Sequence, residues 1–120
     1  MTNVLKHLGK TSNDPVDTLD LIPWEGGAIQ VTLDATEFTS HCPVTDQPDF
    51  GTLEISYAPR ASIAETKSVK LYLRRYRDLR AFNEVIVDRV CDDFFQQLSP
   101  SWVRVVGRFN PRGGIAVYVD

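Results

Sequence analysis

The chain has 120 residues, of which 42% are hydrophobic and 24% charged, which fits one ordinary globular domain and excludes a disordered chain. A formal net charge of −3 gives no overall attraction to nucleic acid or to an anionic membrane surface. No run approaches the ~20 apolar residues of a membrane span and the N-terminus lacks the apolar stretch of a signal peptide, so we expect a cytoplasmic protein.

The first part of the chain divides into an arm and two strands. Residues 1–27 are predicted to form an extended N-terminal arm with turns, because proline and glycine interrupt them and periodicity is weak. A single domain is expected over residues 28–120. Residues 28–34, AIQVTLD, alternate with the period of a half-buried strand that ends near Asp34. Residues 51–59, GTLEISYAP, alternate again and predict a second strand.

The middle of the chain changes to a helical period. Residues 62–78 predict a helix with Ser62 able to cap its start. Its apolar side would consist of Val69, Tyr72, Leu73 and Tyr76. Residues 81–98 predict a second helix with a wide apolar stripe that must be buried. That stripe would consist of Phe82, Ile86, Val87, Val90, Cys91, Phe94, Phe95 and Leu98.

The last part of the chain predicts a second hairpin. Residues 101–109 alternate as a strand, NPRGG is typical of a turn, and residues 115–119 form the final strand. The order β-β-α-α-β-β indicates an α+β fold, in which two helices cover one face of an antiparallel sheet. Such a sheet has two unpaired edges, and pairing them between subunits would give a closed ring.

The segment SHCPVTDQPDF, residues 40–50, contains the residues best suited to catalysis. Cysteine attacks as its thiolate, and Asp49 lies close enough in the sequence to transfer a proton to or from Cys42. His41 is less favoured as the base, because consecutive residues of an extended segment point opposite ways. The alternative is a turn in which Asp49 is a cap and Cys42 a small buried group. No disulfide or metal site is expected, and Cys91 is predicted to lie in the core.

Charged residues further along the chain predict contacts with a ligand. Lys67 and Lys70 are neighbours on one helical face and are suited to bind phosphate, although a solvated helix face has the same pattern. Glu84 is suited either to accept two N–H groups of a guanine-like ring or to favour the positive end of its helix. Arg112, within NPRGG, either binds an anion or belongs to a simple hairpin turn.

Four segments, in this order and spacing, resemble one known family. They are EFTSHCPVTDQPDF, ETKSVKLYL, AFNE and GRFNPRGGI, and the resemblance covers roughly residues 28–119. The chain is similar to the short, single-domain NADPH-dependent nitrile reductases of queuosine biosynthesis, the 7-cyano-7-deazaguanine reductases. That family has the signature E-(S/L)-K-(S/A)-h-K-(L/Y)-(Y/F/W), and residues 65–72 fit it everywhere except at Thr66.

The resemblance implies a fold, a reaction and an assembly. The family has the tunnelling fold, and its short members form pentameric barrels stacked as decamers with active sites between subunits. Cys42 would add to the nitrile carbon to give a covalent thioimide, and Asp49 would supply protons. Two hydride transfers from NADPH would then give 7-aminomethyl-7-deazaguanine.

The resemblance also implies which residues bind the two ligands. The small-molecule substrate would be held by Glu84, with Ala64, Glu65, Thr66 and Asn83 lining the same pocket. The NADPH phosphates and ribose would be held by Thr66, Lys67, Lys70, Arg112 and Gly113. No nucleic acid, membrane or metal is expected to take part.

Three residues depart from the family pattern. Asn83 stands where the family usually has histidine, and asparagine forms hydrogen bonds but does not titrate. Thr66 replaces serine or leucine. Asp46 replaces the glycine of T-G-Q-P-D-F, and aspartate is among the residues that tolerate a positive φ there.

Two other functions stay open from the sequence. One is that of the archaeal amidinotransferases that share this fold and cysteine and act on the nitrile within transfer RNA without NADPH. Lys67, Lys70 and PRGG, together with the acidic composition, argue against it. The other is a catalytically weakened, purine-binding ring, which Asn83 suggests.

Overall fold

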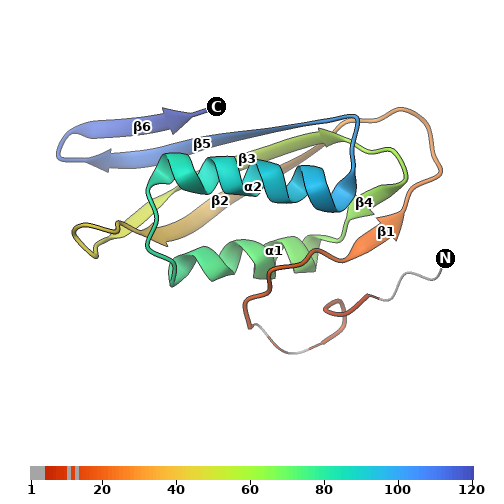
Figure 1. Cartoon of the computed structure of the whole chain (residues 1–120), viewed down its shortest axis with the longest axis horizontal. Coiled ribbons are helices and arrows are strands. Elements are labelled where there is room, and N and C mark those ends of the chain that lie inside the picture. Colours follow the sequence, from red (N-terminus) through yellow and green to blue (C-terminus); the bar gives the residue numbers. More distant parts are fainter. Residues whose placement is uncertain (1–4, 11, 13) are drawn as a thin grey trace.

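The computed structural model describes residues 5–10, 12 and 14–120, and its main element is a four-stranded antiparallel sheet. Residues 1–4, 11 and 13 of the predicted arm lie outside the described residues. The strands follow the order β2-β3-β5-β6 across the sheet (Figure 1). Their bounds are Val31–His41 for β2, Pro48–Ala58 for β3, Trp102–Arg112 for β5 and Ile115–Val119 for β6. The predicted α+β class is therefore confirmed.

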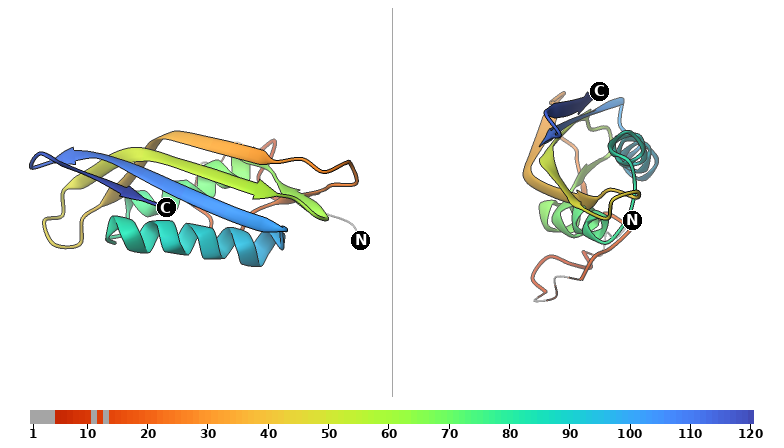
Figure 2. Two further views of the ribbon diagram at one scale, coloured as in Figure 1. Left: turned by 90° about the horizontal axis from the view of Figure 1, so that it is seen from above. Right: turned by 90° about the vertical axis from the view of Figure 1, so that its left-hand side faces the viewer.

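The helices cover one side of this sheet, as Figure 2 shows. They are α1 (Thr66–Arg74), the short 3₁₀ helix η1 (Arg75–Arg77) and α2 (Asn83–Leu98). The core lies between the layers, where Tyr57, Tyr72 and Phe94 are fully buried. All four residues predicted for the apolar side of the first helix are buried, which confirms that side.

A small second sheet corrects the predicted start of the first helix. Residues 62–64 form strand β4 (Ser62–Ala64), which pairs with β1 (Leu21–Pro23) from the predicted arm. Ser62 is therefore not the cap. Glu65 caps α1, and its two carboxylate oxygens accept hydrogen bonds from the backbone N–H groups of Lys67 and Ser68 at 2.7 and 2.9 Å.

Irregular pairing explains why the predicted strand ends were wrong. The first strand does not end near Asp34 but continues to His41, because a shift of register between Ala35 and Phe38 interrupts the alternation without ending the strand. A similar shift between Phe109 and Arg112 lets β5 extend into the expected turn. Cys42 therefore lies directly at the end of a long hairpin.

The apolar stripe predicted for the second helix is buried only in part. Ile86, Val87, Val90, Phe94 and Leu98 are buried. Phe82 and Phe95 are instead 54% and 48% exposed in the single chain, and Cys91 is partly buried at the edge of the core. Among the described residues, no helix is long and apolar enough to cross a membrane.

Candidate active site

The Cys42 pocket lies at the end of the molecule where three connections meet. The β2–β3 loop, the start of α2 and the β5–β6 turn all reach this end (Figure 1). The pocket has a volume of about 390 Å³. Its lining includes Cys42, Asp49, Asn83, Glu84 and Arg112. The structure thus brings together both predicted catalytic residues and two of the predicted substrate-binding residues.

Backbone hydrogen bonds fold the Cys42 loop back on itself. The N–H of Cys42 donates to the carbonyl of Gln47 at 3.0 Å, and the N–H of Asp46 donates to the carbonyl of Cys42 at 3.1 Å. Asp46 has φ of 56°, a left-handed conformation that aspartate tolerates better than most residues. Its carboxylate pairs with Arg80, with 2.8 Å between Oδ1 and Nε, which ties the loop to the segment before α2.

The loop favours the reactive form of the cysteine. Hydrogen bonds from the Thr45 side chain, the Thr45 N–H and the Val44 N–H lower the pKa of Cys42 below its usual value. The negative charge of Asp49 acts in the opposite direction but is the weaker influence. Sequence reasoning missed Thr45, although a hydroxyl residue three positions after a cysteine in a turn is a readable signal.

Asp49 forms an ion pair that the sequence did not predict. Its side chain is 10% exposed, and its Oδ1 lies 2.6 Å from Nη1 of Arg112. The same guanidinium donates to Thr45 Oγ1 at 3.4 Å and to Gln47 Oε1. Arg112, expected at the cofactor, therefore contacts the catalytic loop, while Gly113 lies in the turn that follows with φ of 59°.

The start of α2 supplies two further polar residues of the pocket lining, Asn83 and Glu84. Glu84 is exposed in the first turn of the helix. The side-chain oxygen of Asn83 is buried and has no hydrogen-bond partner among the described residues. His41 is not part of the lining, as the strand geometry led us to expect.

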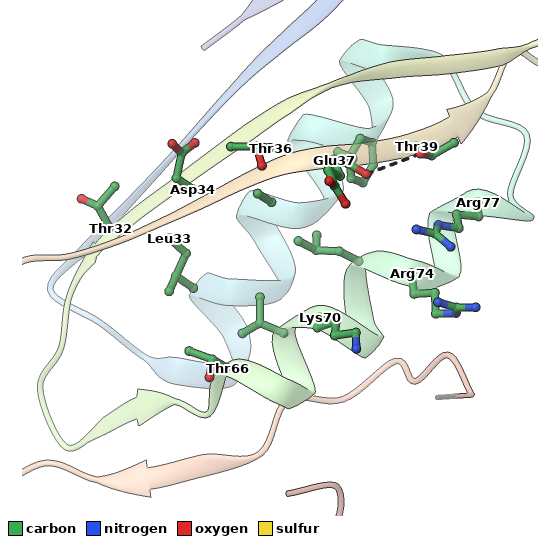
Figure 3. A pocket seen from close by; sticks show the side chains of 14 residues that line it. Thr32, Leu33, Asp34, Thr36, Glu37, Thr39, Thr66, Lys70, Arg74 and Arg77 are labelled. Carbon is green, nitrogen blue, oxygen red and sulfur yellow. Dashed lines mark hydrogen bonds between the residues drawn. The ribbon is translucent and has the colours of Figure 1, made fainter. Parts of the chain in front are cut away.

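A second cleft lies between β2 and α1 and has a volume of about 520 Å³. Figure 3 shows Lys70, Arg74 and Arg77 along the helical side of this cleft, with Thr66 at its end. No ion pair joins these three cations to another described residue. Lys67 does not line the cleft, because its ammonium group donates to the carbonyl of Lys10.

One chain does not bring all the predicted ligand-binding residues together. Ala64 and Glu65 are buried between β4 and α1, and Thr66 begins that helix, at the end of the molecule opposite the Cys42 loop (Figure 1). None of the three lines the Cys42 pocket. Both oxygens of Glu65 are used in capping α1, which explains its burial.

Comparison with known proteins gives a consistent result. Residues 48–120 match the model of the QueF-like protein family. The NADPH-dependent 7-cyano-7-deazaguanine reductase of Anaeromyxobacter sp. (strain Fw109-5) is 46% identical over 90 residues, covering 75% of this chain and 74% of the relative. The reductase of the same name from Syntrophus aciditrophicus is 48% identical over 90 residues, covering 75% and 64%.

A solved structure supports the fold. The apo crystal structure of the archaeosine synthase QueF-Like superposes with a TM-score of 0.68 and covers 80% of this chain and 92% of its own. At 18% identity, this similarity concerns the fold alone. It agrees with the tunnelling fold that the family resemblance implied.

Proposed function

The chain belongs to the family of the NADPH-dependent 7-cyano-7-deazaguanine reductases, and we propose that the Cys42 pocket is where its nitrile substrate reacts. The function is the NADPH-dependent reduction of 7-cyano-7-deazaguanine to its aminomethyl form in queuosine biosynthesis. The observation that carries the proposed site is a cysteine of lowered pKa in one pocket with Asp49 and Glu84.

Cys42 and Asp49 together perform the covalent step. The sulfur of Cys42 bonds to the nitrile carbon while one π bond of the C≡N group opens toward nitrogen. Asp49 takes the thiol proton and delivers it to that nitrogen, so that a neutral thioimide results. The carbon–sulfur bond breaks after the first reduction, when the sulfur leaves as a thiolate and an imine remains for the second reduction, and Asp49 again moves the protons.

Glu84 and Asn83 orient the substrate ring. A carboxylate accepts two N–H donors side by side, which is the pattern on the guanine-like edge of the substrate. Glu84 lines the pocket and is an exposed residue. Asn83 lines the same pocket, and its side-chain amide is suited to form a further hydrogen bond with the ring.

The cleft between β2 and α1 fits the cofactor. Its volume of about 520 Å³ is in the usual range for ligand sites, and its three cations, which form no ion pair with another described residue, suit phosphate groups. When bound, NADPH supplies hydride to the substrate carbon. Thr66 and Lys70 would hold it, together with the neighbouring Arg74 and Arg77. For Lys67 and Gly113, the proposed contact with the cofactor rests on the family resemblance alone.

Loss of a cation from this cleft should weaken cofactor binding. We expect Lys70→Gln to raise the KM for NADPH about tenfold, since a charged hydrogen bond to phosphate is lost, with a much smaller change in kcat. The matched control is Arg104→Gln, which removes a surface cation paired with Asp120. Steady-state kinetics with varied NADPH provide the measurement, and equal KM values in the two variants would contradict the cofactor site.

Residues from two subunits complete one active site in this proposal. The Cys42 pocket and the start of α1 lie at opposite ends of one chain (Figure 1). Strands β2 and β6 are unpaired at the two edges of the sheet, and Ile115 and Tyr118 on β6 are 69% and 73% exposed. Pairing β2 with β6 of a second copy continues the sheet into a ring. A decamer of two pentamers in the cytoplasm is the proposed assembly.

Complementation between inactive variants tests the shared site. Cys42→Ala and Lys70→Glu should each be inactive alone, whereas oligomers that contain both should regain activity. If the two variants assemble at random, about one quarter of the subunit interfaces place an intact Cys42 pocket beside an intact Lys70 cleft. Activity is measured on co-expressed, doubly tagged oligomers. If mass analysis shows both variants in one oligomer and activity is still absent, the site lies within one subunit.

Coupled consumption of the two substrates tests the function itself. Reducing a nitrile to a primary amine takes four electrons, so two NADPH should be oxidised for each amine formed. Absorbance of NADPH and mass analysis of the product give this ratio. Binding of the nitrile without NADPH oxidation would instead favour the purine-binding ring, and reaction only with nitrile-containing transfer RNA would favour the amidinotransferase.

A further inference from the structure

The guanidinium of Arg112 lies at the centre of the polar groups in the Cys42 pocket. Besides the 2.6 Å contact with Asp49, it donates to Thr45 and Gln47, which belong to the loop that carries the nucleophile. Its pKa is raised, first by the hydrogen bond to Asp49 and further by its interaction with the Cys42 sulfur. Among the residues that line this pocket, all of them described, Arg112 is the one with a permanent positive charge.

The carboxylate of Asp49 works against a thiolate at Cys42. The negative charge of Asp49 raises the pKa of Cys42 and thus opposes the thiolate. Asp49 is nearly buried, so water screens its charge poorly. A guanidinium that pairs with Asp49 offsets the repulsion while the carboxylate stays next to the sulfur, where proton transfer requires it.

We propose that Arg112 is a catalytic residue of the covalent step, which holds the Cys42 sulfur and the Asp49 carboxylate in a reactive pair before any cofactor binds. This inference rests on the proposed function and deepens it. It also differs from the role that the family resemblance implied, in which Arg112 binds the cofactor. The two roles predict different results when no cofactor is present.

The charges balance through each stage of the step. In the resting pocket, the thiol is neutral and Arg112 pairs with the Asp49 carboxylate. When Asp49 takes the thiol proton, the negative charge moves to sulfur and the guanidinium faces the thiolate. The sulfur–carbon bond then forms, the nitrile nitrogen takes the proton from Asp49, and the ion pair with Arg112 returns. Arg112 therefore faces one negative charge throughout the step.

Other charged groups around the sulfur do not take over this role. Glu84, from α2, adds a second negative charge to the pocket. Asp46 and Arg80 are paired with each other, with both side chains more than half exposed to solvent. His41 precedes the cysteine but is absent from the pocket lining. Removing Arg112 thus leaves two carboxylates facing the sulfur without a cation in the pocket.

Alkylation of Cys42 by iodoacetamide measures the proposed role without nitrile or cofactor. The rate follows the thiolate fraction, so its pH profile gives the pKa of the thiol. We expect Arg112→Gln to move the midpoint to higher pH and slow alkylation at pH 7 about tenfold, as one pKa unit corresponds to tenfold less thiolate. At a pH above both midpoints the two rates should converge. Arg112→Lys keeps the charge, so its alkylation midpoint should lie between those of the natural chain and Arg112→Gln.

Two internal references keep the alkylation experiment specific. Arg108→Gln removes the other β5 arginine that pairs with a β3 carboxylate, Glu54, but does not line the pocket, so its profile should equal that of the natural chain. Peptide mass analysis separates Cys42 from Cys91. Burial and the charges of Asp88 and Asp92 raise the pKa of Cys91, so it should react more slowly at pH 7.

Adduct formation with the nitrile in the absence of NADPH completes the test. Arg112→Gln should slow the appearance of the Cys42 adduct to a similar extent. Unchanged alkylation and adduct rates in Arg112→Gln and Arg112→Lys, with only the KM for NADPH raised, would overturn this inference and leave the proposed function standing. If the natural chain alkylates normally but forms no adduct, the proposed function fails instead.

Discussion

Replacing Cys42 by alanine should reduce nitrile-dependent NADPH oxidation to the background rate. The thioimide turns an inert triple bond into a C=N group that hydride can reduce, and Cys42 is the one thiol among the described residues that line the pocket. We expect a loss of at least about 10⁴-fold in kcat/KM, which corresponds to about 5.5 kcal/mol of transition-state stabilisation. Absorbance of NADPH at saturating nitrile is the measurement.

Cys91→Ala is the matched control for this loss. Its thiol is partly buried on α2, outside the Cys42 pocket, and its raised pKa makes it a poor nucleophile. The control should keep its activity, with at most a small loss of stability from the missing packing. A Cys42→Ala variant that still turns over, or a Cys91→Ala variant that does not, would show that the nucleophile has been assigned wrongly.

Replacing Asp49 by asparagine should abolish turnover while leaving the thiol reactive. An amide of the same shape neither takes the thiol proton nor supplies protons to nitrogen, and such a loss costs about 10²–10⁴-fold in rate. The opposing charge next to the sulfur is also removed, so the pKa of Cys42 should fall further. Alkylation by iodoacetamide at pH 7 should therefore be as fast as in the natural chain, or faster.

Loss of turnover with an unchanged or faster alkylation of Cys42 distinguishes a defect in proton transfer from a loss of structure. A misfolded pocket would lose its turnover together with the low pKa of its thiol, because the Thr45 and Val44 hydrogen bonds depend on the folded loop. Turnover of Asp49→Asn within a few fold of the natural chain would mean that another group, or water, supplies the protons.

The fold was predictable from local patterns where the alternation was regular. Leu53, Ile55 and Tyr57 alternate cleanly, and all three are fully buried on β3. The end of β2 was missed because its irregular pairing interrupts that alternation. The sequence predicts helix for residues 62–64 because three residues are too few to show a strand period, and their pairing with β1 depends on a distant segment.

The site was predictable where its residues are close in the sequence. Cys42 and Asp49 stand at the two ends of one tight hairpin, so their proximity follows from the turn. The ion pair between Asp49 and Arg112 joins residues 63 positions apart and depends on the β3–β5 pairing, which no local pattern contains. The separation of Thr66 from Cys42 likewise appears only when the elements are placed in space.

The most direct test is the intact mass of the natural chain after incubation with 7-cyano-7-deazaguanine in the absence of NADPH. We predict a mass increase equal to the whole nitrile, since addition loses no atoms, located on the peptide that contains Cys42 and absent from Cys42→Ala. A chain that oxidises NADPH with this nitrile yet never gains that mass, or gains it at Cys91, would contradict a covalent mechanism at Cys42.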